Sequence, residues 1–295
     1  MHMTNELKQK PATDGRTLTR RNVLKLAIAG AGGLLLRPGS AHASGEVDAE
    51  NAAAMLYDAT KCVGCRACEV ACKEWNDLPL EAEPPSDTTA HTWTLIKQYQ
   101  GEAGESFRKY QCMHCLHPAC VSVCTVGALS KTEEGPVVYD TSKCIGCRYC
   151  QYACPFGVPK FEWENPLGLI GKCTFCADRL ADGLIPACAE ACPAGALTFG
   201  TRKQMLQEAR KRIEQNPDRY IDHIYGETEG GGTSVLFLSD IPFEEMGLPT
   251  LGSAPVTHAS VMVVNATPVT CVTAAAVFSG IYWLTKRRNE GLKED

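Results

Sequence analysis

The cysteines have the most distinctive spacing in this sequence. There are 17 in 295 residues, and sixteen of them form four groups of four, each ending in C-x3-C. In chain order the groups are Cys62, Cys65, Cys68 and Cys72; Cys112, Cys115, Cys120 and Cys124; Cys144, Cys147, Cys150 and Cys154; and Cys173, Cys176, Cys188 and Cys192. The groups form an internal repeat, because the third repeats the spacing of the first and the second and fourth are the same loop with insertions.

The spacing C-x2-C-x2-C-x3-C of groups one and three is the bacterial ferredoxin run. Three thiolates on a tight loop can surround one side of a cuboidal cluster, and Gly64 and Gly146 would let the backbone turn closely around it. We expect the fourth cysteine of each run to begin a helix and point away, and so to ligate the other cluster of a pair. Sixteen thiolates are enough for four [4Fe–4S] clusters.

Zinc and disulfide bonds are the competing uses of such cysteines. Zinc sites of four cysteines usually combine two separated C-x2-C pairs, and the tight ferredoxin run does not suit one tetrahedral ion. Disulfide frameworks are typical of small secreted domains, whereas this chain is too long to need them. A [3Fe–4S] cluster is not indicated, because no group lacks a ligand. We therefore predict four [4Fe–4S] clusters.

Other polar residues near the groups give weaker signals. His114 and His117 lie inside group two, where four thiolates are already available, so we expect them to shape the loop and donate hydrogen bonds that tune the cluster potential. Lys61, Lys143 and Lys172 each precede the first cysteine of a group. Such a cation could raise a cluster potential or be a solvated loop charge, and the sequence favours neither reading.

The N-terminus has the pattern of an export signal. Arg20 and Arg21 precede a short apolar stretch at 26–36, and small residues follow, with cleavage expected after Ala43. The arginine pair resembles the twin-arginine signal. A buried or amphipathic helix is the alternative, but the glycine content and charged flank argue against it. A route that exports folded proteins would let the thiolates bind iron before they reach an oxidising compartment.

The C-terminus carries a candidate membrane anchor. Residues 259–284 contain no charged side chain and are longer than the roughly 20 residues that cross a bilayer core. Tyr282 and Trp283 precede Lys286, which begins a basic run, as expected for an anchor with a cytoplasmic C-terminus. A buried core helix is the alternative. We expect Cys271, the seventeenth cysteine, to be a small apolar filler; a palmitoyl or metal site is the other reading.

The remaining patterns define the organisation of the chain. Strands are expected at 92–99, 136–139 and 235–238, a helix from the capping box at Thr201 to about Ile213, and a glycine-rich turn at 229–233. We predict five segments: a twin-arginine signal peptide at 1–43, a four-cluster domain at 44–200, an extension at 201–258, a transmembrane anchor at 259–284 and a cytoplasmic tail at 285–295. The net charge of −5 does not suggest nucleic acid as a partner.

Residues 55–200 resemble the four-cluster ferredoxin-like subunits of membrane oxidoreductases, and the match extends into the tail. Stretches similar to the hydrogenase-2 type are Met55-Leu56-Tyr57-Asp58, Gln111-Cys112-Met113-His114-Cys115, Cys120-Val121-Ser122-Val123-Cys124, Gly146-Cys147-Arg148-Tyr149-Cys150, Tyr225-Gly226-Glu227 and Glu229-Gly230-Gly231-Gly232-Thr233. Glu74-Trp75-Asn76-Asp77 is instead similar to formate dehydrogenase beta subunits. The export signal favours the hydrogenase type, because that beta subunit usually lacks one.

The resemblance implies an α+β fold of two ferredoxin-like dicluster modules with a pseudo-twofold relation, plus one C-terminal transmembrane helix. It also implies that group one pairs with group four, and group two with group three. The implied ligand sets are Cys62, Cys65, Cys68 and Cys192 (site A); Cys72, Cys173, Cys176 and Cys188 (site B); Cys112, Cys115, Cys120 and Cys154 (site C); and Cys124, Cys144, Cys147 and Cys150 (site D).

The function implied by the resemblance is electron transfer through four [4Fe–4S] clusters, without catalysis by the chain itself. The expected partners are a periplasmic catalytic subunit, a [NiFe]-hydrogenase, and an integral membrane quinone-reactive subunit at the periplasmic face of the inner membrane. A molybdopterin formate dehydrogenase is the alternative catalytic partner. An enzyme with its own site would need a molybdenum, nickel or flavin motif, which we do not find. A cluster carrier would need labile ligation, against which sixteen committed thiolates argue.

Overall fold

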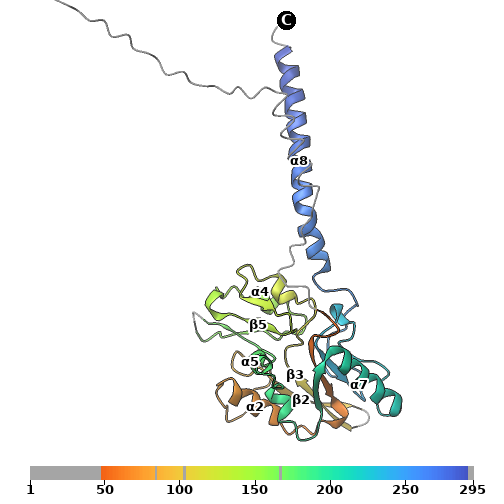
Figure 1. Cartoon of the computed structure of the whole chain (residues 1–295). Helices are drawn as coiled ribbons and strands as arrows, with labels where there is room; N and C mark the ends of the chain where they lie inside the picture. The colour runs from red at the N-terminus through yellow and green to blue at the C-terminus, as the bar shows by residue number, and fades with distance from the viewer. Residues whose placement is uncertain (1–47, 84, 102–103, 166–167, 292–295) are drawn as a thin grey trace, which may run out of the picture. The chain divides into compact units, whose positions relative to one another are not determined.

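The computed structural model describes residues 48–83, 85–101, 104–165 and 168–291 (Figure 1). The described residues divide into two compact units, one at 48–262, called the body below, and the other at 263–291. The predicted signal peptide and the last four residues of the predicted tail lie outside the described residues.

The first half of the body contains short elements separated by the cysteine loops. These are β1 (Ala53–Asp58), the 3-10 turn η1 (Ala59–Lys61), α2 (Ala67–Trp75), β2 (Leu95–Gly101), β3 (Gly104–Tyr110), α3 (Ala119–Ser122), β4 (Leu129–Lys131), β5 (Val137–Tyr139), η2 (Thr141–Lys143) and α4 (Tyr149–Ala153). The strand expected at 92–99 is β2, which begins at Leu95 and forms an antiparallel hairpin with β3. The run at 136–139 is β5, as predicted.

The second half of the body contains β6 (Lys160–Phe161), β7 (Ile170–Gly171), α5 (Ala177–Ala181), α6 (Ala187–Glu190), β8 (Leu197–Thr201), α7 (Arg202–Gln215), η3 (Glu229–Gly231) and β9 (Val235–Leu238). The predicted capping box at the start of α7 is confirmed, because the Thr201 hydroxyl accepts from the Gln204 amide and the Gln204 side chain accepts from the Thr201 amide. Asn216 caps its C-terminus, and the strand predicted at 235–238 is β9.

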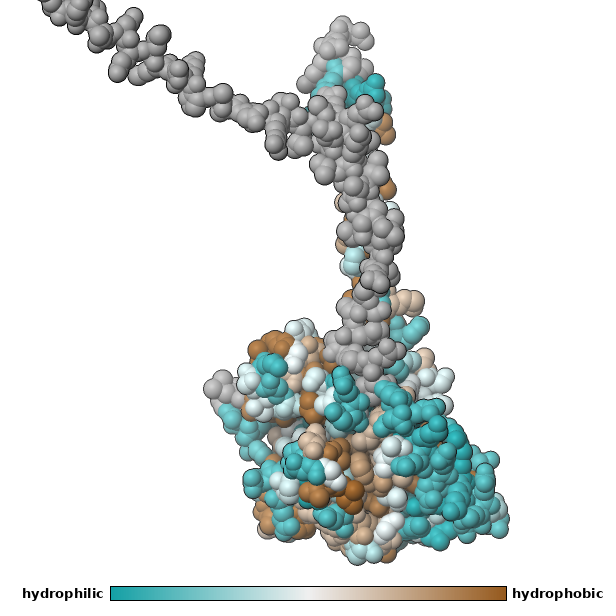
Figure 2. All heavy atoms as spheres, viewed as in Figure 1, coloured by the Kyte–Doolittle hydropathy of each residue, from teal (hydrophilic) through white to brown (hydrophobic). Residues whose placement is uncertain are grey.

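A three-stranded sheet in the order β8-β1-β9 joins the first and last parts of the body. β1 is antiparallel to β8 and parallel to β9. Successive side chains of β1 point to opposite faces: Ala54 and Leu56 pack with Met205 and Ala209 of α7, whereas Met55 belongs to the core cluster that contains cysteines of the candidate sites. Figure 2 shows hydrophilic side chains gathered over α7.

Two parts of the body repeat the same local structure. β1, η1 and α2 follow one another as β5, η2 and α4 do, and each run encloses a ferredoxin-type cysteine loop. β8 pairs antiparallel with β1, as β4 pairs with β5, and each of these partner strands follows a short helix that begins after a proline. The repeat seen in the cysteine spacing is therefore also a repeat of secondary structure.

The helix α8 (His258–Gly291) is long and apolar enough to cross a membrane. It is a candidate membrane span by its length and composition, and none of its membrane-length window is buried. The helix extends beyond the predicted anchor through the basic run, where Lys286 and Glu290 form an ion pair at 3.9 Å.

Candidate iron–sulfur cluster sites

The two ferredoxin-type loops begin in the same way. Asp58 is fully buried at the N-terminus of η1 and accepts hydrogen bonds from the Thr60 amide (3.2 Å) and hydroxyl (2.7 Å). Asp140 accepts the equivalent bonds from Ser142 at 3.0 and 2.6 Å. Each capped turn fixes the direction in which the chain reaches the first cysteine of the loop, so a local side-chain contact positions that cysteine.

A glycine turns each loop, as predicted. Gly64 and Gly146 have φ of +66° and +67°, in the left-handed region that glycine enters without steric penalty. A Cβ atom on Gly64 would lie 2.4 Å from the Phe107 ring, and one on Gly146 would lie 3.4 Å from Phe161. The first loop is therefore the more tightly enclosed.

The expectation that the fourth cysteine begins a helix is wrong. α2 starts at Ala67, after Arg66 has reversed the chain at φ 61°, so Cys72 lies in the second turn of the helix. Cys154 is the residue that ends α4. The helix starts earlier because the reversal that closes the loop falls directly after the second cysteine. The third cysteine lies in the same short helix, so one helical turn separates it from the fourth, and the helix carries the fourth cysteine away from the first two.

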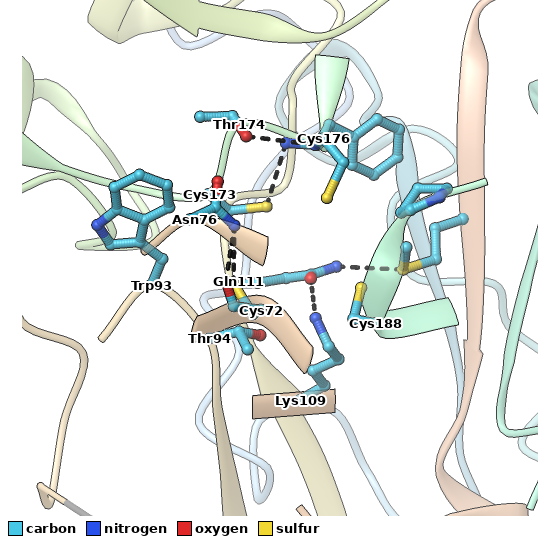
Figure 3. Close-up of a pocket in the computed structure, with 13 residues that line it drawn as sticks. Cys72, Asn76, Trp93, Thr94, Lys109, Gln111, Cys173, Thr174, Cys176 and Cys188 are labelled. Carbon is cyan, nitrogen blue, oxygen red and sulfur yellow. Dashed lines mark hydrogen bonds between the residues drawn. The ribbon is translucent and has the colours of Figure 1, made fainter. Parts of the chain in front are cut away.

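The four cysteines of site B line one cavity, which contains about 340 Å³ of space including open solvent. Figure 3 shows Cys72, Cys173, Cys176 and Cys188 around it, with Lys109 reaching in toward Gln111 and Trp93 at one side. Group one supplies the first of these cysteines and group four the other three, although about a hundred residues separate the two groups in the sequence. All four cysteines are buried.

Sites A and D each correspond to a similar cavity. Cys62, Cys65, Cys68 and Cys192 line one of about 330 Å³, and Cys124, Cys144, Cys147 and Cys150 line another of about 340 Å³, again including open solvent. Cys65 of site A and Cys147 of site D are exposed, in contrast to the cysteines of sites B and C, which are buried or half-buried. Each of these two cavities therefore has one cysteine near the surface.

The cysteines of site C interact electrostatically with one another. Burial raises the pKa of the Cys115 thiol well above its usual value, and the nearby thiols of Cys112, Cys154 and Cys120 raise it further. Cys154 reaches this set from group three, whereas the others belong to group two. The structure thus brings together the four cysteines that the resemblance implies for site C.

Electrostatic interactions between the sets indicate a linear order of the sites. Across sets, Cys68 interacts with Cys188, Cys173 with Cys112, and Cys120 with Cys150. These pairs join site A to B, B to C, and C to D. The two sites with an exposed cysteine are therefore the ends of the series.

The thiols suit a polynuclear thiolate-bound cluster. Burial raises the pKa of Cys68, Cys120 and Cys173 to about 12, so these side chains stay protonated at neutral pH until a metal displaces the proton. Soft thiolate donors select zinc or iron–sulfur clusters. Within the described part of the chain, no three His, Cys, Asp or Glu side chains converge closely enough for a single metal ion. Cavities lined by four separated thiols fit a cluster better than a point-like ion.

The three lysines that precede cysteine groups differ in their environment. Lys61 and Lys143 are partly or largely exposed and lie beside Asp58 and Asp140, at 4.0 and 2.9 Å respectively. Lys172 is only 2% exposed. The sequence does not distinguish the three lysines, whereas the structure shows that one is buried and the other two are charges on loops.

Sequence reasoning missed two further buried lysines, Lys109 on β3 and Lys131 on β4. Burial lowers the pKa of Lys109, but the thiols of Cys188, Cys68, Cys173 and Cys72 outweigh this and raise it above its usual value. Burial lowers the pKa of Lys131 to about 8, against the opposite effect of the site C thiols. Both lysines lie on strands distant in sequence from most of these thiols, so cysteine spacing gives no signal for them.

His114 is fully buried and adopts a left-handed backbone at φ 45°. Its Nδ1 accepts a hydrogen bond from the Val137 amide at 2.9 Å, so a neutral ring carries its proton on Nε2. Among the described residues, that Nε2 has no hydrogen-bond partner. The ring packs against Phe175 with centroids 4.5 Å apart. His114 therefore packs where groups two and four meet, and its Nε2 donates no hydrogen bond to another described residue.

Comparison with known proteins also indicates iron–sulfur clusters. A family model described as a 4Fe–4S dicluster domain matches residues 105–202, which include groups two, three and four. A protein of Nitratidesulfovibrio vulgaris is 43% identical over 254 residues, 82% of this chain and 69% of its own length. The hydrogenase-2 operon protein HybA of Escherichia coli O157:H7 is 38% identical over 277 residues, 79% of this chain and 84% of its own.

The iron–sulfur subunit of the nitrate-inducible formate dehydrogenase of Escherichia coli K12 is also 38% identical, over 213 residues, 66% of this chain and 72% of the relative. The chain therefore belongs to the family of iron–sulfur subunits that contains HybA and the formate dehydrogenase iron–sulfur subunits. It is an electron-transfer iron–sulfur subunit, and its cysteine count fits four clusters.

Proposed function

We propose that the chain carries electrons in series through four [4Fe–4S] clusters held at sites A, B, C and D. The observation that carries this proposal is the linear order of four cysteine sets, each containing one cysteine from a second group. When bound, the clusters supply one-electron transfer. The protein supplies sixteen thiolates, the enclosing loops and a mostly buried environment for sites B and C.

The proposed arrangement is two ferredoxin-like modules with a pseudo-twofold relation. Sites A and B form one module from groups one and four, and sites C and D form the other from groups two and three. The repeated order of strand, 3-10 turn and helix supports this, as does the packing of His114 on Phe175, which occupy the same place in groups two and four. Both residues have a left-handed backbone, with φ of 45° and 62°.

Electrons would enter and leave at sites A and D, since each has an exposed cysteine. Apolar side chains surround the exposed cysteine of site D, including Ile145 and Tyr149 at 66% and 60% exposure, and Val63 beside site A is 64% exposed. Such surfaces around a redox centre suit docking of partner subunits. One partner would be the catalytic subunit and the other an integral membrane subunit that reacts with quinone.

We propose a periplasmic location, with export by the twin-arginine route and α8 as the anchor. The five segments would then be the signal at 1–43, the cluster domain at 44–200, the extension at 201–258, the anchor at 259–284 and the tail at 285–295. The extension is closely joined to the cluster domain, because β9 pairs with β1 and α7 packs on the same sheet.

The proposed catalytic partner is a [NiFe]-hydrogenase. Support comes from the relative named as a hydrogenase-2 operon protein, because the match covers 84% of that protein's length. A molybdopterin formate dehydrogenase is the second candidate, because the nitrate-inducible enzyme's iron–sulfur subunit is equally identical, although over a shorter length. Metal analysis of the subunit that co-purifies distinguishes the two, since one contains nickel and the other molybdenum.

The proposed ligand sets are tested with two cysteines of the same group. We expect Cys192→Ala to disturb the cluster at site A and Cys188→Ala the cluster at site B, each seen as loss of a different component from the electron paramagnetic resonance spectrum of the reduced complex. Cys271→Ala is the control, and it should leave every component unchanged. If both group-four variants removed the same component, each group would hold its own cluster and the proposed pairing would be wrong.

A further inference from the structure

Three lysines are buried in the body without a counter-charge at contact distance. Lys109, Lys131 and Lys172 are 1%, 6% and 2% exposed. Among the described residues, none of the three has a carboxylate oxygen within 4.0 Å of its amino group. Lysines are rarely this buried unless they are paired.

The hydrogen bonds that these amino groups donate go to neutral oxygens. Lys109 donates to the Gln111 side chain. Lys131 donates to the carbonyl of His114 at 3.2 Å and to that of Gly135. Lys172 donates to two carbonyl oxygens, that of Val137 at 2.5 Å and that of Cys173 at 2.8 Å. These bonds orient the lysines but leave their positive charges uncompensated, which is unfavourable in a buried environment.

Among the described residues, Glu69 is a carboxylate that interacts electrostatically with Lys109. It accepts a hydrogen bond from the Ile96 amide at 2.6 Å and lies 3.8 Å from the Arg66 guanidinium. Its negative charge therefore already interacts with the Ile96 amide and the Arg66 guanidinium. The compensating charge for the lysines must come from another source.

The candidate cluster sites are that source. Lys109 interacts with thiols on both sides of the junction between sites A and B, namely Cys68, Cys72, Cys173 and Cys188. Lys131 interacts with Cys112, Cys115 and Cys120 of site C. Lys172 interacts with Cys120 of site C, and its amino group bonds to the carbonyl of Cys173 at site B. The three cations thus lie along the inner part of the series.

We propose that Lys109, Lys131 and Lys172 are the buried counter-charges of the clusters and that they raise the reduction potentials of the sites they face. The inference rests on the proposed function, because it requires clusters at these cysteines. Reduction adds one electron and makes a thiolate-bound cluster more negative. A nearby buried cation stabilises the more negative state more strongly, because the low surrounding dielectric screens it little.

The chain provides a matched control in Lys143. Lys143 and Lys172 both directly precede the first cysteine of a group, at Cys144 and Cys173. The Lys143 side chain is 58% exposed and is paired with Asp140 at 2.9 Å, so water and a carboxylate already screen its charge. If any positive charge before a cysteine raised the cluster reduction potential, removal of either lysine would lower that potential. If only a buried counter-charge raises it, removal of Lys172 alone would lower it.

The test is a redox titration of the full chain with its partner subunits, followed by electron paramagnetic resonance, for the unmodified complex and for Lys109→Met, Lys172→Met and Lys143→Met. Iron and sulfide are measured in each sample. We expect Lys172→Met and Lys109→Met each to lower the equilibrium constant for one-electron reduction of a neighbouring cluster about tenfold. This corresponds to a decrease of about 59 mV in its reduction potential. Lys143→Met should titrate as the unmodified complex does.

The outcomes separate this inference from the proposed function. Unchanged potentials in Lys109→Met and Lys172→Met with full iron content would overturn the inference and leave the proposed function standing, as would an equal shift in Lys143→Met. If Lys172→Met loses iron, retention of iron in Lys172→Arg supports a role for the charge, and loss from both variants contradicts it. An unmodified complex without iron and sulfide in this chain would remove the proposed function and the inference together.

Discussion

At the scale of single residues, the geometry of the Cys62 loop depends on a glycine. Gly64 adopts a left-handed backbone and faces the Phe107 ring of β3, which closes the loop from one side. A residue with a side chain pays a conformational penalty of roughly 1–2 kcal/mol in this left-handed backbone. At Gly64 its Cβ atom would also overlap the Phe107 ring. The absence of a side chain at Gly64 therefore allows the hairpin to pack closely on the loop.

We expect Gly64→Ala to lower the iron content of site A and the thermal denaturation temperature of the complex. The matched control is Gly127→Ala, because Gly127 has a similar φ of +64° but a Cβ atom added there would have no neighbour within 4 Å. Only the conformational penalty of about 1–2 kcal/mol applies at that position. Equal effects of the two substitutions on iron content would show that contact with Phe107 is unimportant.

The identity of the cysteines could be predicted from the sequence, but their charged surroundings could not. Ligand spacing within a loop is a local property, and the turn at Gly64 follows from the same local pattern. Lys109 and Lys131 lie on strands whose sequences show nothing unusual, and each faces thiols contributed by other segments. The sequence alone does not distinguish a buried lysine from a surface lysine, because burial depends on tertiary contacts.

At the scale of elements, the cysteine loops determine where the short helices begin. The left-handed residues Arg66 and Arg148 are the N-caps of α2 and α4. Helix propensity alone does not place a boundary there, which is why the sequence suggested a start at the fourth cysteine. By contrast, α7 was predictable at both ends, because its capping box and Asn216 are local signals.

The helix α8 is longer than the apolar segment that predicted it. Hydropathy marks the part suited to a bilayer core, whereas the helix continues into basic residues that favour helical structure. Its threonines are compatible with an apolar environment, because Thr267, Thr270 and Thr273 each donate to the carbonyl four residues earlier, at 2.7, 2.9 and 2.8 Å. Pro268 lies inside the helix and has no amide hydrogen to donate.

We expect a chain that ends at Thr257, before α8, to leave the membrane fraction while its body keeps its iron and sulfide. The body forms its own compact unit and contains all sixteen cysteines of sites A to D. Cys271→Ser is the control, because it keeps the apolar length but removes the only thiol of α8, and it should stay membrane-bound. Membrane retention of the shortened chain in cells that lack the partner subunits would contradict the role of α8 as the anchor.

At the scale of the whole molecule, the central feature of the body is the order of the four cysteine sets. Spacing predicts how many clusters the chain can hold but does not say which site neighbours which. The order is inferred from the electrostatic interactions of Cys173 with Cys112 and of Cys120 with Cys150, which join groups separated in sequence. The exposure of Cys65 and Cys147 at the two ends completes an arrangement suited to conduction between two partners.

The account depends most directly on the metal content of the purified chain. Iron, acid-labile sulfide and zinc should be measured per chain in the intact complex, after subtraction of the clusters in its partners. Four [4Fe–4S] clusters predict about sixteen iron and about sixteen sulfide. A content of about four zinc without sulfide would contradict the account, because the same sixteen thiolates would then be holding single ions.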